Sequence, residues 1–82
     1  MQPIQDLLHR IQWDADFGRG AFVIGYLDHA APALVRVPWS RVRFEHGEHF
    51  SLDVQDENGR WQMVPLHRVR AVWCDGRLIW QR

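Results

Sequence analysis

Two segments of this chain, residues 37–43 and 64–70, share the pattern Val-Pro-x-x-Arg-Val-Arg, with identical residues at five of seven positions. Proline has no backbone N–H, which excludes it from the interior of a helix and from the middle of a sheet. A proline that precedes alternating apolar and charged residues is typical of the start of a strand. The pattern therefore predicts two strands with outward arginines, and five identities are too few to show an internal duplication.

The segment that precedes the first glycines, residues 3–13, has the pattern of an amphipathic helix. Its apolar residues form one stripe at helical spacing: Ile4, Leu7, Leu8 and Ile11. Pro3 suits the first position of a helix. We expect the ring of Trp13 in the core, because tryptophan is usually well buried. We expect Asp14 to pair with a nearby arginine or to cap a turn.

The chain beyond residue 20 has the pattern of strands joined by turns. Residues 21–29 are rich in branched and aromatic side chains and predict one strand, and residues 30–34 predict a loop. Alternation then places Val42, Phe44, Phe50, Leu52 and Val54 inward and Arg41, Arg43 and Glu45 outward. Residues 46–48 predict a turn, and Asn58-Gly59 is a signal for a two-residue hairpin loop.

A second hairpin signal, Asp75-Gly76, also predicts a register. A two-residue turn places Cys74 opposite Arg77, Trp73 opposite Leu78, Val72 opposite Ile79 and Ala71 opposite Trp80. One face then carries Val69, Ala71, Trp73, Leu78 and Trp80, and the other carries Arg68, Arg70 and Gln81. Because this register separates apolar from polar side chains, we expect the first face to lie in the core.

The fold expected from these elements is α+β: an N-terminal helix packed on a strongly bent antiparallel sheet or a small open barrel of five to six strands. With 82 residues, the chain is expected to form a single domain over residues 1–82. Its sequence has no apolar run long enough to cross a membrane, and Gln2, Gln5 and Asp6 argue against a signal peptide. The single cysteine, Cys74, argues against an internal disulfide, so we expect a cytoplasmic protein with no membrane partner.

Charge is balanced, with ten basic and ten acidic residues, which argues against non-specific binding to polyanions. All ten basic residues are arginine. Arginine presents a planar fork that pairs with phosphate through two hydrogen bonds, whereas lysine is a point charge. A genome whose codons favour arginine is the alternative explanation.

His67 and Arg68 form a candidate phosphate site at the start of the second repeated segment. A guanidinium supplies charge, and an imidazole supplies a directed hydrogen bond that can become charged near neutral pH. Tyr26 and Asp28 are a second candidate pair, because an aromatic ring beside an acid can stack a base and accept from a 2′-hydroxyl. The alternatives are a surface histidine in a loop and structural roles for Tyr26 and Asp28.

Metal and catalytic motifs are weak in this sequence. His46, Glu48 and His49 lie together, but a metal needs three or four ligands and a solvated turn explains them better. No phosphate-binding glycine loop, nucleophile elbow or paired-carboxylate motif is present. We therefore expect no cofactor, no metal and no catalytic residue.

Taken together, the segments "RIQWD", "YLD", "VPWSRV", "VPLHRVRAV" and "DGRLIWQR" resemble the RNA cyclic-group end recognition domain family over nearly the whole chain. The resemblance implies a small domain, free-standing or fused to RNA-processing enzymes, that recognises RNA ends with a 2′,3′-cyclic phosphate. The matching positions are Tyr26, Asp28, Pro38, Arg41, Pro65, His67, Arg68 and Trp80. The chain departs from the family at Ala15, where proline is common, and at His29, where arginine is common.

The function expected on this basis is binding of RNA 3′ ends, in RNA processing or repair, by Arg41, His67, Arg68, Tyr26 and Asp28. The repeat then predicts that Arg41 and Arg68 meet on one phosphate. Two alternatives stay open. One is an adaptor that docks on an RNA-processing enzyme, and the other is a phosphoesterase that uses His67 as its acid–base group.

Overall fold

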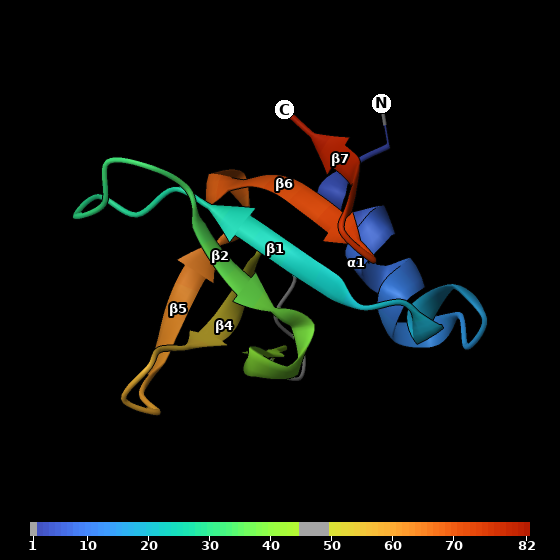
Figure 1. The fold of residues 1–82 in the computed structure, drawn as a ribbon, viewed down its shortest axis with the longest axis horizontal. Coiled ribbons are helices and arrows are strands. Elements are labelled where there is room, and N and C mark those ends of the chain that lie inside the picture. The colour runs from blue at the N-terminus through green and yellow to red at the C-terminus, as the bar shows by residue number, and fades with distance from the viewer. Residues whose placement is uncertain (1, 45–49) are drawn as a thin grey trace.

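The computed structural model describes residues 2–44 and 50–82 (Figure 1). Its elements in chain order are α1 (Ile4–Trp13), the 3-10 turn η1 (Phe17–Arg19), β1 (Phe22–Tyr26), β2 (Val35–Pro38), the 3-10 turn η2 (Trp39–Arg41), β3 (Val42–Arg43), β4 (Ser51–Gln55), β5 (Trp61–Pro65), the 3-10 turn η3 (Leu66–Arg68), β6 (Val69–Cys74) and β7 (Arg77–Gln81). The expected turn at residues 46–48, the outward Glu45 and the cluster of His46, Glu48 and His49 lie outside the described residues.

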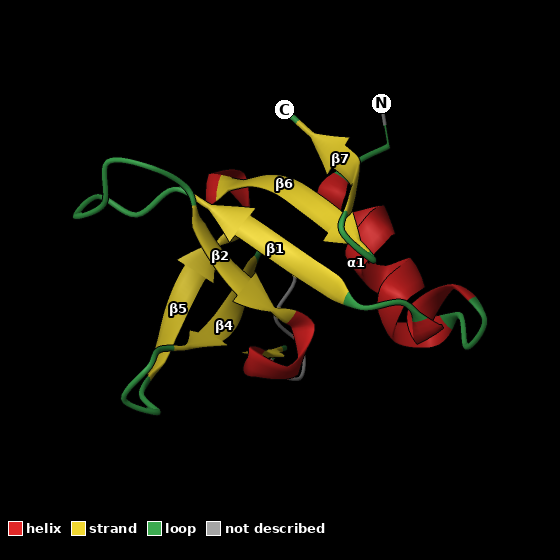
Figure 2. Ribbon diagram, in the orientation of Figure 1, coloured by secondary structure: helices red, strands yellow, loops and turns green. Residues whose placement is uncertain are grey.

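The strands form two antiparallel sheets, one with the order β2-β1-β6-β7 and one with the order β3-β4-β5 (Figure 2). The expected α+β class, with an N-terminal helix packed on an antiparallel sheet, is confirmed. The described strands number seven rather than five or six, because a 3-10 turn follows the proline in each repeated segment and separates two strands.

Each repeated segment forms a corner between the two sheets. Pro38 is the last residue of β2 and Pro65 is the last residue of β5, so both prolines end a strand and the expectation that they begin one is wrong. Their backbone angles are alike, with φ −70° and ψ 152° for Pro38 and φ −61° and ψ 141° for Pro65. After each 3-10 turn the valine N–H donates to the carbonyl of the first residue of the turn, as in Val42 to Trp39. The first corner leaves the four-stranded sheet, and the second returns to it.

The alternation of the repeat explains why both corners close onto the core. In each corner the valine before the proline is buried and the first residue of the turn packs inward, whereas the next residue is exposed. The inward side chains are Val37, Trp39 and Val42 in one corner and Val64, Leu66 and Val69 in the other. The repeated sequence therefore encodes a sheet-to-sheet corner.

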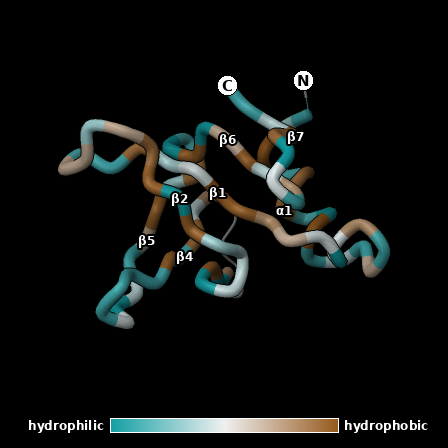
Figure 3. Tube along the Cα trace, in the orientation of Figure 1, coloured by the Kyte–Doolittle hydropathy of each residue, from teal (hydrophilic) through white to brown (hydrophobic). Residues whose placement is uncertain are grey.

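Helix α1 covers the core with the expected stripe, since Ile4, Leu7, Leu8 and Ile11 are all buried. In Figure 1 the helix passes behind β6 and β7, and its stripe belongs to the same cluster as Ile24, Val72 and Trp80. Trp80 Nε1 donates to the Gln2 carbonyl at 2.7 Å, which ties β7 to the chain start. Figure 3 shows hydrophobic residues along β1 and hydrophilic ones at the β4–β5 turn.

Two aromatic residues expected inside are exposed: Trp13, at 73%, and Phe50, at 74%. Trp13 lies two positions beyond Ile11, about 200° around the helix, and so misses the buried stripe. Phe50 precedes β4, so its side chain is outside the alternation that buries Leu52 and Val54.

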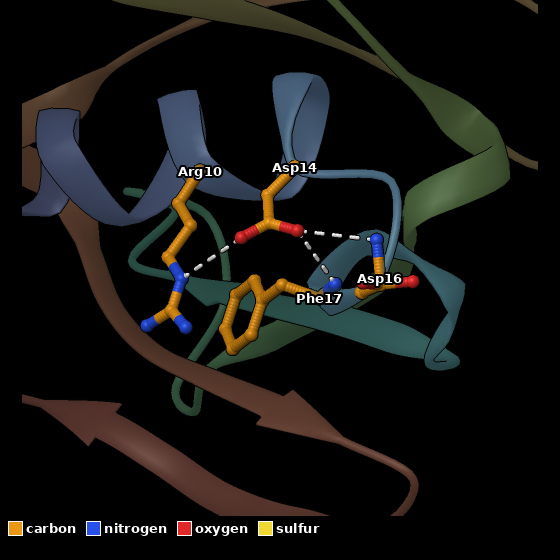
Figure 4. A network of polar contacts seen from close by, with 4 residues as sticks. All are labelled: Arg10, Asp14, Asp16 and Phe17. Atoms are coloured by element: carbon orange, nitrogen blue, oxygen red, sulfur yellow. Dashed lines mark hydrogen bonds and ion pairs between the residues drawn. The ribbon is translucent and has the colours of Figure 1, made fainter.

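The expected role of Asp14 is confirmed (Figure 4). One carboxylate oxygen accepts from the backbone N–H groups of Asp16 and Phe17, each at 3.1 Å, and the other lies 3.7 Å from Arg10 Nε. These contacts, chiefly the bond from Phe17, hold the pKa of Asp14 below its usual value.

The β6–β7 hairpin follows the expected register only near its turn. Cys74 pairs with Arg77 and Trp73 with Leu78, but a bulge then shifts the register, so Val72 faces Trp80 and Ala71 faces Gln81. Because one extra residue reverses the side-chain alternation, Trp80 is buried while Leu78 is 42% exposed and Trp73 is half-buried. The expected core face is therefore correct for Trp80 and wrong for Trp73 and Leu78.

The β4–β5 hairpin is present, but its loop has three residues. Asp56 N–H donates to the Arg60 carbonyl at 2.8 Å, and Gly59, with φ 82°, closes the turn. One Asp56 carboxylate oxygen accepts from the N–H groups of Arg60 and Asn58, and these bonds lower the pKa of Asp56. The preference of Asp56 for capping this turn accounts for the longer loop.

Candidate RNA-end site

Four of the five expected site residues lie together at the second of the two corners, where the end of β1 meets the turn η3. Tyr26 is the last residue of β1, and Asp28 lies in the loop that follows it. Turn η3 carries His67 and Arg68, and the Arg68 carbonyl accepts from the Leu27 N–H at 2.9 Å. This bond joins the end of β1 to η3, so two segments about forty residues apart in sequence form one surface.

Tyr26 is buried, which changes its expected role. Its side chain is in the core cluster at 7% exposure, so its ring cannot stack a base. Burial raises the pKa of the Tyr26 hydroxyl, and the negative charges of Asp28 and then Asp56 raise it further. The hydroxyl therefore stays protonated near neutral pH.

Asp28 shapes the loop after β1. Its carboxylate accepts from the Ala30 N–H at 3.1 Å, and its carbonyl accepts from the Ala31 N–H at 3.1 Å. This is a turn stabilised by its own side chain, and it uses one carboxylate oxygen. The turn carries His29 next to η3.

Arg68 and His29 are in direct contact, through Arg68 Nη2 and His29 Nε2. Neither side chain forms an ion pair with an acid in the described parts of the chain. His29 was set aside because arginine is common at this position in the family it resembles. Its contact with Arg68 places residue 29 beside the candidate site, at a position where the sequence departs from the family pattern. An imidazole keeps a nitrogen donor there and carries charge only when protonated.

Arg82 positions the turn that carries His67 and Arg68. Its guanidinium donates to the Val69 carbonyl at 3.0 Å and to the Leu66 carbonyl at 2.5 Å. Its backbone N–H donates to the Arg70 carbonyl at 3.0 Å. Beside it, Arg70 Nε is buried and has no hydrogen-bond partner among the described residues. No sequence pattern indicated either role, because both depend on how β7 lies against η3.

Comparison with known families was made on the whole sequence. The model of the MJ1316 RNA cyclic group end recognition domain matches residues 1–82. The chain belongs to this family. No curated protein and no solved structure matches it. The resemblance expected from "YLD", "VPLHRVRAV" and "DGRLIWQR" is thereby confirmed, and the family name indicates recognition of RNA ends with a cyclic group.

Arg41, the fifth expected site residue of this family member, lies apart from the other four. It ends η2, which follows Pro38, and Pro38 pairs with Val23 near the start of β1. Tyr26 is three residues further along β1, a distance of about 10 Å, and Arg68 lies beyond it. The two corners thus place Arg41 and Arg68 at opposite ends of β1, and the structure does not bring them together.

No group of three or more His, Cys, Asp and Glu side chains in residues 2–44 and 50–82 could hold a metal ion. The described helices include none long and apolar enough to cross a membrane. Burial raises the pKa of the Cys74 thiol, with the Asp75 charge and hydrogen bond adding to it, so the thiolate form is disfavoured.

Proposed function

We propose that this domain binds the 3′ end of RNA that carries a 2′,3′-cyclic phosphate, at the corner formed by Tyr26, Asp28, His29, His67 and Arg68, without chemistry of its own. The observation that carries the proposal is the contact between Arg68 Nη2 and His29 Nε2, in which the guanidinium of one segment donates to the imidazole of another, and neither side chain has an ion-pair partner in the described residues. Membership of the family supports RNA as the partner.

The charge of the corner favours a cyclic phosphate over an open one. A cyclic phosphate is a phosphodiester and carries one negative charge, whereas a terminal phosphate monoester carries nearly two at pH 7. Arg68 supplies one permanent positive charge, and Asp28 and Asp56 lie close enough to raise the pKa of Tyr26. These carboxylates repel the second charge of an open phosphate, so a monoanion fits the corner better.

Each group has a distinct role in this proposal. Arg68 donates two parallel hydrogen bonds to the two unesterified oxygens of the phosphate, and the imidazoles of His29 and His67 donate further hydrogen bonds to it. The second oxygen of Asp28 accepts from the 2′-hydroxyl of the preceding nucleotide, which separates RNA from DNA. Arg41 stays a candidate for a contact away from the terminal phosphate.

A phosphoesterase is the second candidate function. His67 precedes Arg68 in the turn and His29 contacts it, so two acid–base groups and a cation lie close together. Purified protein should leave a cyclic-phosphate oligonucleotide intact over hours if the domain only binds. Turnover that His67→Ala abolishes and His9→Ala preserves would favour the phosphoesterase.

The test of binding is a titration with short RNAs that end in a cyclic phosphate, a 3′-phosphate or a hydroxyl. Arg68→Ala should weaken binding to the cyclic end by about 2–4 kcal/mol, roughly 30- to 700-fold. Arg68→Lys should also weaken it, because a point charge cannot replace the fork. Arg41→Ala removes the arginine from the same position of the other corner and is the matched control for end preference: it should keep the wild-type ratio of affinities for the three ends, even if binding of every RNA weakens equally. Equal binding of all three ends by the wild type would refute the proposal.

A further inference from the structure

The outer face of the four-stranded sheet carries a groove that the RNA-end site does not use. Its volume is about 350 Å³, and its lining residues are Val23, Arg36, Pro38, Trp73 and Gly76. They come from β1, β2 and β6 and from the β6–β7 turn, and all lie within the described residues. The groove begins at Val23, about 10 Å along β1 from Tyr26.

Trp73 forms one wall of this groove because its side chain lies on the face of β6 opposite to the buried Val72. Its ring lies beside Gly25, the residue of β1 that also pairs with Arg36 and Ala71. A Cβ added at Gly25 would lie 2.8 Å from Cζ3 of the ring, closer than side-chain contacts allow. The glycine therefore leaves room for a large aromatic ring on the sheet surface.

Arg36 covers the free side of this ring. Its guanidinium carbon lies 4.3 Å from the centre of the Trp73 ring, which holds the guanidinium by a cation–π contact. Arg36 is exposed and forms no ion pair with an acid of the described residues. Stacking leaves the N–H donors at the edge of the guanidinium and its outer plane open to a ligand.

The groove thus combines an apolar floor with one cation held in place. Val23, Pro38 and the edge of Trp73 suit a flat, poorly hydrated ring, and a phosphate would lose its hydration against them. A planar guanidinium stacks on a nucleobase and can donate hydrogen bonds to its edge. The positive charge of Arg36 also attracts a polyanionic strand.

We propose that this groove binds a nucleobase of the RNA strand, one or more nucleotides before the end group held at the Arg68 corner. The inference rests on the proposed function, and it adds a second subsite that is independent of the end chemistry. The Arg68 corner selects the end, and the Trp73–Arg36 stack adds affinity for the strand without selecting its end.

The other sheet offers a matched control. On its outer face Arg43 lies over the Trp61 ring at 4.1 Å, which reproduces the aromatic–arginine stack. Arg43 Nε, however, lies 3.3 Å from a carboxylate oxygen of Asp53, so its charge is neutralised. If an unpaired guanidinium beside an apolar groove is what binds RNA, changes at Trp61 should have little effect.

The experiment compares a mononucleoside 2′,3′-cyclic phosphate with a pentanucleotide that has the same end and with a pentanucleotide that ends in a hydroxyl. Arg36→Gln and Trp73→Leu should each weaken binding of both pentanucleotides by roughly 5- to 150-fold, the contribution of stacking one base. Both variants should bind the mononucleotide as the wild type does and keep its ratio of affinities for the two ends. Trp61→Leu should match the wild type throughout.

Three results would overturn the inference. One is pentanucleotide binding by Arg36→Gln within about twofold of the wild type. Another is an equal loss in Trp61→Leu, which would indicate a general surface effect. The third is a loss of end preference in Arg36→Gln, which would place Arg36 at the end site. Failure of the proposed function itself looks different, because the wild type would then bind both pentanucleotides equally while Arg36→Gln still weakened both.

Discussion

Replacing Trp80 tests the packing on which the whole arrangement depends. Its ring is 6% exposed and lies in the cluster that joins α1, β1 and β6, and its Nε1 donates to the Gln2 carbonyl. A buried tryptophan removes about 200 Å² from water, which at 25 cal/mol per Å² corresponds to about 5 kcal/mol. Allowing for what alanine retains and for relaxation, Trp80→Ala should lower the free energy of unfolding by about 3–5 kcal/mol.

That loss is large for a chain of 82 residues, whose total stability should be about 4–12 kcal/mol. Urea unfolding followed by circular dichroism measures it as a lower midpoint with an unchanged slope. Trp80→Phe separates the two contributions. It keeps most of the ring and loses the bond to Gln2, whose carbonyl regains water, so the cost should be about 1–2 kcal/mol.

Trp13→Ala is the matched control, since it makes the same substitution at an exposed ring. It should change stability by less than about 0.5 kcal/mol. A loss at Trp13 equal to that at Trp80, or a loss below 1 kcal/mol at Trp80, would refute the account of the core and of the bulge that turns Trp80 inward.

Three further variants test other parts of the structure. Gly25→Ala should displace the Trp73 ring and cost about 1–3 kcal/mol of unfolding free energy, measured by urea unfolding; no loss would contradict the close placement of the ring. Arg82→Ala removes one hydrogen bond to Leu66 of η3 and one to Val69, the first residue of β6, and should cost about 1–3 kcal/mol; it should also weaken the preference for cyclic ends in the RNA titration. The pKa of Asp14 is lowered from 3.8, so its charge stabilises the fold above that pH and the benefit is lost as pH falls through the folded pKa. Asp14→Asn should therefore be less stable than the wild type at pH 7, and the two stabilities should converge at lower pH; a constant difference would contradict this origin.

Local signals in the sequence predicted the elements that depend only on neighbouring residues. The spacing of Ile4, Leu7, Leu8 and Ile11 gave a correct helix and a correct buried face. The two turn dipeptides gave two correct hairpins, and the pairing of Cys74 with Arg77 was correct. In each case residues close together in the sequence decide the backbone conformation, so no information from distant segments is needed.

The predictions of buried side chains fail where one extra residue in a strand reverses which face the following side chains lie on. The bulge between Val72 and Trp73 leaves the apolar character of the strand unchanged but exchanges which side chains are buried. Nothing in the sequence distinguishes Trp73 from Trp80 as the inward ring. On the outer face, Gly25 of the neighbouring strand leaves room for the Trp73 ring, which a Cβ at that position would meet at 2.8 Å.

The sequence indicated which residue types form the candidate site, but only partly which of these residues lie close together. Tyr26, Asp28, His67 and Arg68 belong to one corner because the Leu27 N–H bonds the Arg68 carbonyl, a contact that no spacing indicates. Arg41 has the same sequence context as Arg68 but follows a strand that pairs at the other end of β1.

Comparison of the two corners shows which features come from the repeated sequence and which come from the neighbouring loops. Their common pattern fixes a proline-ended strand, a 3-10 turn and an inward valine, and the arginine of each turn faces outward by default. Arg68 becomes a candidate ligand only because the loop after β1 brings His29 against it. Arg41 has no such neighbour among the described residues, although its corner has the same backbone path. Packing against the core therefore accounts for the shape of both corners. The proposed phosphate site depends in addition on the loop that lies beside one of them.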